Sequence, residues 1–248
     1  MLRLRSSFLL PCLLLAACSG ISPTLDFSRV QTEFENAFSS DLLFTGRISA
    51  APADYHRVMH SLSTAGISKL DATQRPRAWM MRAVAEWRTG SLSNATASSA
   101  SGLAASPPPH SREQVLLTMI PALVTDSQII TAWKAAGMAY TTEQYAPVES
   151  AYLGAMKSLA AAQAAMDSST PASVRSFHAY HLWRVLFNWE TIIDNLKGGS
   201  SVADQVIRNI RPHFDGRDLL DMADAARQSV PLGDPLRVIM DAEMGSHL

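Results

Sequence analysis

The chain contains very little cysteine, and what it has lies at one end. Its only two cysteines are Cys12 and Cys18, so residues 19–248 contain no thiol. Without thiols, this part of the chain cannot form a disulfide, use a catalytic cysteine or bind a metal through thiolates. We therefore expect it to hold its fold by packing alone.

The sequence also lacks the short motifs of common enzymes and nucleotide-binding proteins. It has no Gly-x-Ser-x-Gly elbow, no Gly-Lys-Ser/Thr phosphate loop, no Gly-x-Gly-x-x-Gly turn and no His-Glu-x-x-His pair. We therefore expect no enzymatic activity and no cofactor.

Histidines provide the only candidate metal ligands with suitable spacing. Two pairs lie one helical turn apart: His56 with His60, and His178 with His181. This spacing can place two imidazoles on one metal, with Asp54 or Glu190 as the nearest third ligand in sequence. However, His181 falls on an apolar stripe, where a histidine is more often a core residue, so we expect no metal site.

No excess of positive charge is present. The chain has 21 basic and 22 acidic residues, a net charge of −1. Nucleic-acid-binding proteins usually carry a basic surplus, so we expect no nucleic-acid partner. After the first residues, no second long apolar run is apparent, which favours a soluble body.

Strand patterns are nearly absent, whereas apolar residues recur at spacings of three and four. This periodicity predicts an all-α protein of antiparallel helical hairpins or an irregular bundle. The predicted helices are 25–38, 52–65 (ended by Gly66), 76–88, 93–106, 112–124, 126–140, 143–167, 171–196, 201–211, 216–229 and 235–244. Pro121 is expected to bend or end the helix that begins at residue 112. The helix beginning at 171 is apolar on nearly all sides, so we expect it at the centre of the C-terminal half.

The first residues have the pattern of an export signal. Arg3 and Arg5 precede a short apolar stretch, which is too short to span a bilayer and ends in small residues. The ending Leu15-Ala16-Ala17-Cys18 resembles the bacterial lipobox. In that family the signal is cleaved before the cysteine, which then carries the lipid.

The resemblance implies a division of the chain. Residues 1–17 would be the signal peptide, 18–24 a lipidated tether that begins at Cys18, and 25–248 the helical domain. Two or three acyl chains such as palmitate would hold the protein at the membrane. Because Ser19 rather than Asp follows the cysteine, the chain resembles lipoproteins sorted to the periplasmic face of the outer membrane. Cleavage would remove two arginines and no acid, which changes the net charge from −1 to −3.

Residues 76–107 resemble a tetratricopeptide repeat, a helix–turn–helix unit of about 34 residues. The residues that match its pattern are Trp79, Ala83, Gly90, Leu92, Ala95, Leu103 and Pro107. In such a unit Trp79 would be buried against the second helix, Ala83 and Ala95 would face each other, and Gly90 would form the turn. The chain departs from the family at Arg82, Glu86 and Ser99, and lacks the three regular units of a solenoid. An ordinary helical hairpin is therefore the alternative.

The polar side of this hairpin is the expected partner-binding surface. It would carry Arg75, Arg82, Glu86 and Arg88, with Arg82 and Glu86 paired on the exposed side. We therefore expect a membrane-anchored helical adaptor that binds other proteins of the cell envelope.

The alternative is a periplasmic protein that binds a small apolar ligand. Trp183, Phe187 and Trp189 of helix 171–197, with Met156 and Met166, could line its cavity, although such sets more often form core. A closed apolar pocket of roughly 300–1,000 Å³ would favour this alternative, whereas a wide open groove would favour the adaptor.

Overall fold

The computed structural model describes residues 26–44 and 53–245. The predicted signal peptide, Cys18 and tether lie outside these residues. Within the described part the chain is helical and has no strand, which confirms the predicted all-α class. Its helices are α1 (Phe27–Phe44), α2 (Ala53–Ser61), α3 (Thr64–Ser68), α4 (Arg75–Arg88), α5 (Leu92–Ala104), α6 (Arg112–Ala135), α7 (Thr142–Ala164), α8 (Ala172–Asp194), α9 (Ser200–Ile210), the short 3₁₀ helix η2 (Arg211–Phe214), α10 (Leu219–Gln228) and α11 (Pro235–Gly245).

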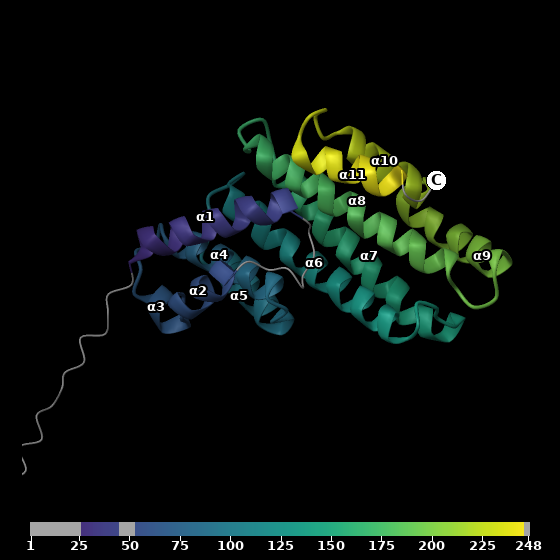
Figure 1. The fold of residues 1–248 in the computed structure, drawn as a ribbon, viewed down its shortest axis with the longest axis horizontal. Helices are drawn as coiled ribbons and strands as arrows, with labels where there is room; N and C mark the ends of the chain where they lie inside the picture. The colour runs from purple at the N-terminus through teal and green to yellow at the C-terminus, as the bar shows by residue number, and fades with distance from the viewer. Residues whose placement is uncertain (1–25, 45–52, 246–248) are drawn as a thin grey trace, which may run out of the picture.

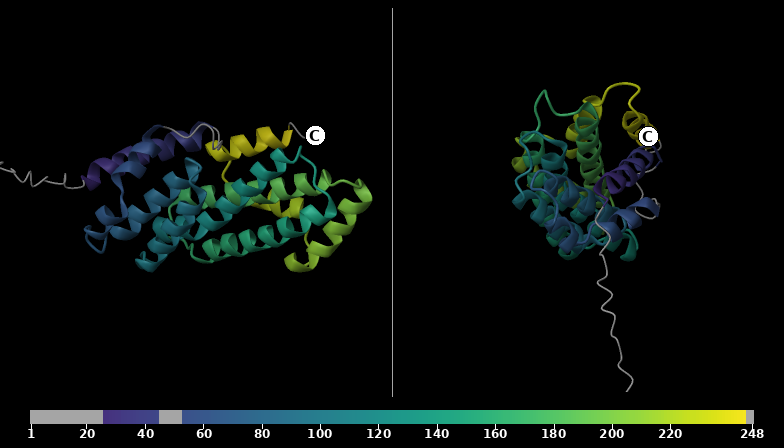
Figure 2. Two further views of the ribbon diagram at one scale, coloured as in Figure 1. Left: turned by 90° about the horizontal axis from the view of Figure 1, so that it is seen from below. Right: turned by 90° about the vertical axis from the view of Figure 1, so that its left-hand side faces the viewer.

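The helices form one elongated bundle with a single hydrophobic core (Figure 1). Helices α1 to α5 occupy one end, α6 and α7 run through the middle, and α9 lies at the far end. Successive helices α4 to α8 pack against their neighbours in the sequence. The C-terminal helix α11 returns to contact α1 (Figure 2), so the first and last described helices touch, although the start of α1 and the end of α11 lie far apart.

Helix α8 is the central helix of the C-terminal half, as its apolar surface predicted. It contacts α6, α7, α9, α10 and α11. Trp183 and Trp189 are completely buried, and the Trp189 indole donates a hydrogen bond to the Tyr145 hydroxyl over 2.7 Å. Burial of side chains this large makes α8 the main source of core contacts in this half.

Helix α6 is continuous, so the prediction of two helices separated after Pro121 was wrong. A proline inside a helix leaves the carbonyl four residues earlier without its N–H partner, here that of Leu117. The Ser99 hydroxyl, on α5, donates a 2.6 Å hydrogen bond to this Leu117 oxygen. The neighbouring helix thus supplies the bond that Pro121 cannot, and α6 continues to Ala135.

Gly66 was predicted to end the helix at 52–65, and this prediction was also wrong. The helix α2 ends at Ser61, and Gly66 lies inside the next helix, α3. The Ser63 hydroxyl accepts a 3.0 Å hydrogen bond from the Gly66 N–H, which caps the start of α3.

The predicted hairpin at 76–107 is formed by α4 and α5. Ala83 and Ala95 are completely buried, and Gly90 forms the turn with a φ of +83°. Trp79 is only partly buried, although it lies close to α5. A Cβ atom added to Gly102 of α5 would be 3.0 Å from the Cβ atom of Trp79. Leu92 packs against the core and Pro107 follows the end of α5. Leu103, which also matches the repeat pattern, is 39% exposed and so does not lie in the core, as a core residue of such a repeat would.

By length and composition, α6 is apolar enough to cross a membrane, which corrects the expectation that no second long apolar run exists. Most of that stretch is buried, and α4, α5, α7 and α8 pack around it. A core helix of a folded bundle has the same composition.

Candidate functional site

The surface expected to bind a partner is largely closed. Glu86 is only 2% exposed, because its carboxylate accepts hydrogen bonds from the Arg82 guanidinium at 2.7 Å and the Ser98 hydroxyl at 2.6 Å. Arg82 is half-buried and also donates to the Leu62 carbonyl oxygen at 2.9 Å. The expectation of an exposed Arg82–Glu86 pair was therefore wrong. The pair lies inside the fold and ties α4 to α5 and to the start of α3.

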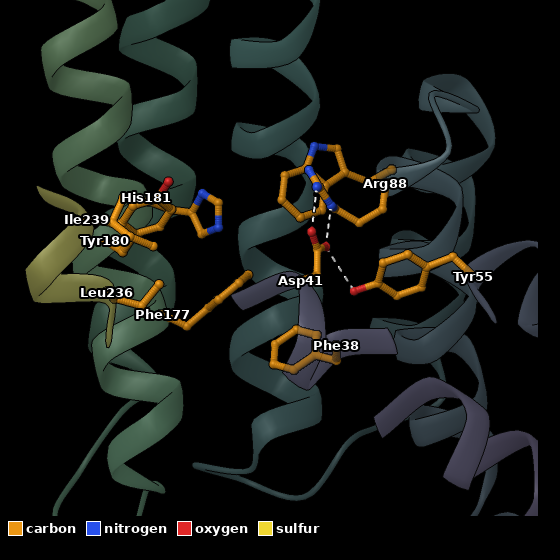
Figure 3. Close-up of a pocket in the computed structure, with 10 residues that line it drawn as sticks. Phe38, Asp41, Tyr55, Arg88, Phe177, Tyr180, His181, Leu236 and Ile239 are labelled. Carbon is orange, nitrogen blue, oxygen red and sulfur yellow. Dashed lines mark hydrogen bonds and ion pairs between the residues drawn. The ribbon is translucent and has the colours of Figure 1, made fainter. Parts of the chain in front are cut away.

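Arg88 is buried as well, where the sequence predicted exposure. Its guanidinium donates two hydrogen bonds to the Asp41 carboxylate, over 2.5 and 2.7 Å, and lies 5.0 Å from the Trp87 ring centroid. The Tyr55 hydroxyl donates to the same carboxylate at 3.1 Å (Figure 3). The pair joins α4 to α1, 47 residues apart in sequence, and its partner Asp41 carried no signal of this role.

A small cavity of about 20 Å³ lies beside the Arg88–Asp41 pair, between α1, α4, α8 and α11. A space of this size holds about one water molecule. His181 borders it, with its ring edge-on to Phe177 and Trp87 (Figure 3 shows His181 and Phe177). Burial, together with Arg184 and Arg88, holds the pKa of His181 well below its ordinary value, so its ring is neutral. This junction is too small for an organic ligand.

Arg75 is the only exposed member of the expected partner-binding set among these described side chains. Its guanidinium donates to the Leu70 and Ser68 carbonyl oxygens, over 2.9 and 3.1 Å. These bonds occupy carbonyls at the end of α3 and just after it, so the side chain stabilises a helix end.

Trp183, Phe187 and Trp189 of α8 pack in or against the core and line neither the small cavity nor the larger one described below. Trp189 stacks on Tyr152 with ring centroids 5.1 Å apart, and Trp183 stacks on Phe187 at 5.4 Å. The interpretation of this aromatic set as core, which the sequence favoured, agrees with that packing. Of the residues proposed for a ligand cavity, only Met156 lines one.

That cavity lies on another face of α8, between α7, α8, η2 and α10, and it opens to the surface, since lining residues such as Ala160 and Ala225 are exposed. We call it the α7–α10 cavity; its volume is about 550 Å³, within the range of roughly 300–1,000 Å³ typical of ligand pockets. Its walls are mostly apolar and include Leu153, Leu182, Phe214 and Met222. In Figure 1, α8 lies between α7 and α10, which together form these walls.

The cavity extends along α8. Its wall on that helix runs from His178 to Leu186, a rise of about 12 Å along the helix axis. Near the His178 end the other polar residues are Gln163 and Ser229. Phe214 marks the opposite end, because its ring meets that of Trp189 with centroids 5.9 Å apart. The cavity is therefore elongated and has few polar groups along its length, which suits an extended apolar molecule.

His178 was a candidate metal ligand and lies at the cavity wall instead. Its Nε2 lies 2.9 Å from the Leu159 carbonyl oxygen, which can only accept, so Nε2 carries the hydrogen. Burial lowers the pKa of His178, and the ring is neutral with Nδ1 as an acceptor. Its partner in the predicted pair, His181, has a separate environment in the small cavity.

The side chains in the described part of the chain form no cluster of potential metal ligands. His56 and His60 are both exposed, and no group of three or more His, Cys, Asp or Glu side chains converges in residues 26–44 and 53–245. Asp126 of α6 is a buried acid, only 3% exposed, and serves the packing of the helices. It accepts hydrogen bonds from Tyr152 at 3.2 Å and Asn188 at 2.9 Å, which joins α6 to α7 and α8.

A second groove, of about 400 Å³, lies near the far end and is lined by charged side chains of α8, α9 and α10. Burial, with the nearby Asp194 and Asp218 carboxylates, raises the pKa of Glu190 there to about 7. In the same groove Arg211 pairs with Asp218 over 2.5 Å. Its charges are mixed, and it lacks the apolar walls of the α7–α10 cavity.

Comparison of the chain with protein-family profiles, with curated proteins and with solved structures finds no match. Inference about function therefore depends on the geometry of the chain itself.

Proposed function

We propose that this chain is a lipid-anchored protein of the cell envelope whose helical body binds an apolar small molecule in the α7–α10 cavity. The observation that carries the proposal is the cavity itself: about 550 Å³, elongated and mostly apolar. A pocket of this size with mostly apolar walls and a few polar groups is the usual place for a small molecule to bind.

Support for the anchor comes from the lipobox at Leu15 to Cys18. A lipid at Cys18 would hold the body close to a membrane, where apolar molecules partition. Mass spectrometry of the mature N-terminus should find an acylated Cys18. An unmodified cysteine there would contradict the anchor while leaving the cavity proposal unaffected.

Adaptor function, the expectation from the sequence, ranks second. It keeps the support of the lipobox and the α4–α5 hairpin. It loses its expected contact surface, because Glu86 and Arg88 are buried and occupied by partners inside the fold.

The test is to fill the cavity without disturbing the core. Ala160 and Ala225 line the cavity and are exposed, so tryptophan at either position can extend into it. Ala161 is also exposed on α7 but does not line the cavity, and Ala161→Trp is the matched control. Residues 19–248 include every described helix and the whole core, so this chain can be used without detergent.

Nile red, an apolar dye, is the probe. Wild-type protein should bind it with increased fluorescence. Ala160→Trp and Ala225→Trp should each weaken binding at least tenfold, and Ala161→Trp should bind as wild type. Equal binding by all four proteins, or no binding by the wild type, would overturn the proposal.

A further inference from the structure

The rim of the α7–α10 cavity carries charge of one sign. Lys157 of α7, with Arg217 and His213 near η2, lines the cavity together with its apolar walls. Among the described residues that line it, none is an aspartate or glutamate. An apolar space with a basic rim complements a molecule with an apolar chain and an anionic head.

The nearby arginines differ from the rim cations in having carboxylate partners. Arg211 pairs with Asp218 over 2.5 Å, and Arg227 pairs with Asp224 over 2.5 Å and also with Asp241. Within the described part of the chain, neither Lys157 nor Arg217 forms an ion pair. Asp218, Asp224 and Asp241 are thus engaged by other arginines, whereas the two rim cations remain available to a ligand.

The position of these groups suits a single extended chain. Arg217 and His213 flank Phe214 at one end of the cavity, and Lys157 lies on the rim of α7. The remaining polar groups, Gln163, His178 and Ser229, carry no charge, and His178 is neutral because burial lowers its pKa. Lys157 precedes by two residues Leu159, whose carbonyl oxygen accepts a hydrogen bond from His178. A head group at Arg217 would leave its chain along the wall of α8. The planar guanidinium can bind both oxygens of a carboxylate.

We propose that the ligand of this cavity is a single-chain amphiphile with a carboxylate head, of the fatty-acid class, whose head is bound by Lys157 and Arg217. This inference rests on the proposed function. It adds that charge selects the ligand, which an apolar cavity alone would not do.

The test compares three molecules with the same chain and different heads: dodecanoate, dodecanol and dodecyltrimethylammonium. Each displaces Nile red from residues 19–248 at concentrations below micelle formation. We expect dodecanoate to bind about tenfold more tightly than dodecanol, equivalent to about 1.4 kcal/mol, and the cationic molecule to bind most weakly. Added salt should weaken the binding of dodecanoate and leave that of dodecanol unchanged.

The double variant Lys157→Glu/Arg217→Glu should remove the preference for dodecanoate and keep the affinity for dodecanol. The control Lys134→Glu/Lys197→Glu makes the same change in net charge at exposed positions outside the cavity and should behave as wild type. Both variants should keep the wild-type circular dichroism spectrum.

Equal affinities for dodecanoate and dodecanol, unaffected by the rim variant, would overturn this inference but not the proposed function. A loss of preference in both double variants would also overturn it, because net charge rather than the rim would then be responsible. Failure of all three molecules to displace Nile red would overturn it together with the proposed function.

Discussion

Two regions of the bundle use arginine in opposite ways. Arg88 is 1% exposed and bound to Asp41 by two hydrogen bonds, whereas Arg217 lies exposed at the rim of an apolar cavity without a carboxylate partner. The first arrangement holds helices α1 and α4 together, because a buried charge must be paired. The second leaves a charge available to solvent or a ligand. The contrast separates charges that stabilise the fold from those that can select a ligand.

Two single variants, each of which removes one of these guanidinium groups, test the comparison with the largest expected effect. Arg88→Met should lower the free energy of unfolding by about 3–5 kcal/mol, because it leaves the Asp41 carboxylate with a charge that lacks its main partner. Arg217→Met should leave the urea unfolding midpoint nearly unchanged. Similar midpoints for the two variants would show that Arg88 is no more structural than Arg217.

Glycines in the two regions offer a second comparison. A Cβ at Gly102 of α5 would lie 2.6 Å from a Leu117 methyl group, whereas one at Gly154 of α7 would meet nothing within 4 Å. Gly102→Leu should destabilise the protein by about 1–3 kcal/mol through overpacking. Gly154→Leu should stabilise it by about 0.5–1 kcal/mol through helix propensity. Thermal unfolding of both variants measures the difference, and a stabilising Gly102→Leu would mean that the hairpin is loosely packed.

A third expected effect, which depends on pH, concerns Glu190 in the charged groove that contrasts with the apolar cavity. Its pKa in the folded protein is raised from 4.5 to about 7, so the folded state holds this proton more tightly than the unfolded state. Stability is therefore lost as the pH rises through this range. Glu190→Gln should be more stable than wild type by about 1 kcal/mol at pH 8, a value reduced for partial exposure.

Urea unfolding at several pH values measures this effect. The advantage of Glu190→Gln over wild type should grow between pH 4.5 and 7. An advantage that does not change with pH would contradict the assignment of the raised pKa to Glu190.

The helices could largely be predicted from the sequence, because their apolar periodicity and stop signals are local. The local signals failed where a distant partner changes the outcome. Pro121 predicts a bend or an end of the helix, but Ser99 satisfies the Leu117 carbonyl and α6 continues to Ala135. No local pattern reveals this bond, since 18 residues separate its two partners.

The site was much less predictable, for the same reason. Arg88 has the sequence context of a surface residue, and only Asp41 on another helix explains its burial. The helix that carries the cavity was identified, but on the wrong face: the large aromatics fill the core, and smaller residues such as Leu182 line the cavity. A cavity is space left between four elements, and its existence depends on how they pack together.

The central claim is that an apolar chain occupies the α7–α10 cavity, and methyl NMR tests it most directly. Met156 and Met222 line the cavity, whereas Met81 and Met119 are completely buried in α4 and α6 and do not. In protein labelled at the methionine methyl groups, dodecanoate should shift the signals of Met156 and Met222 and leave those of Met81 and Met119 in place. Unchanged Met156 and Met222 signals at saturating dodecanoate would contradict the account.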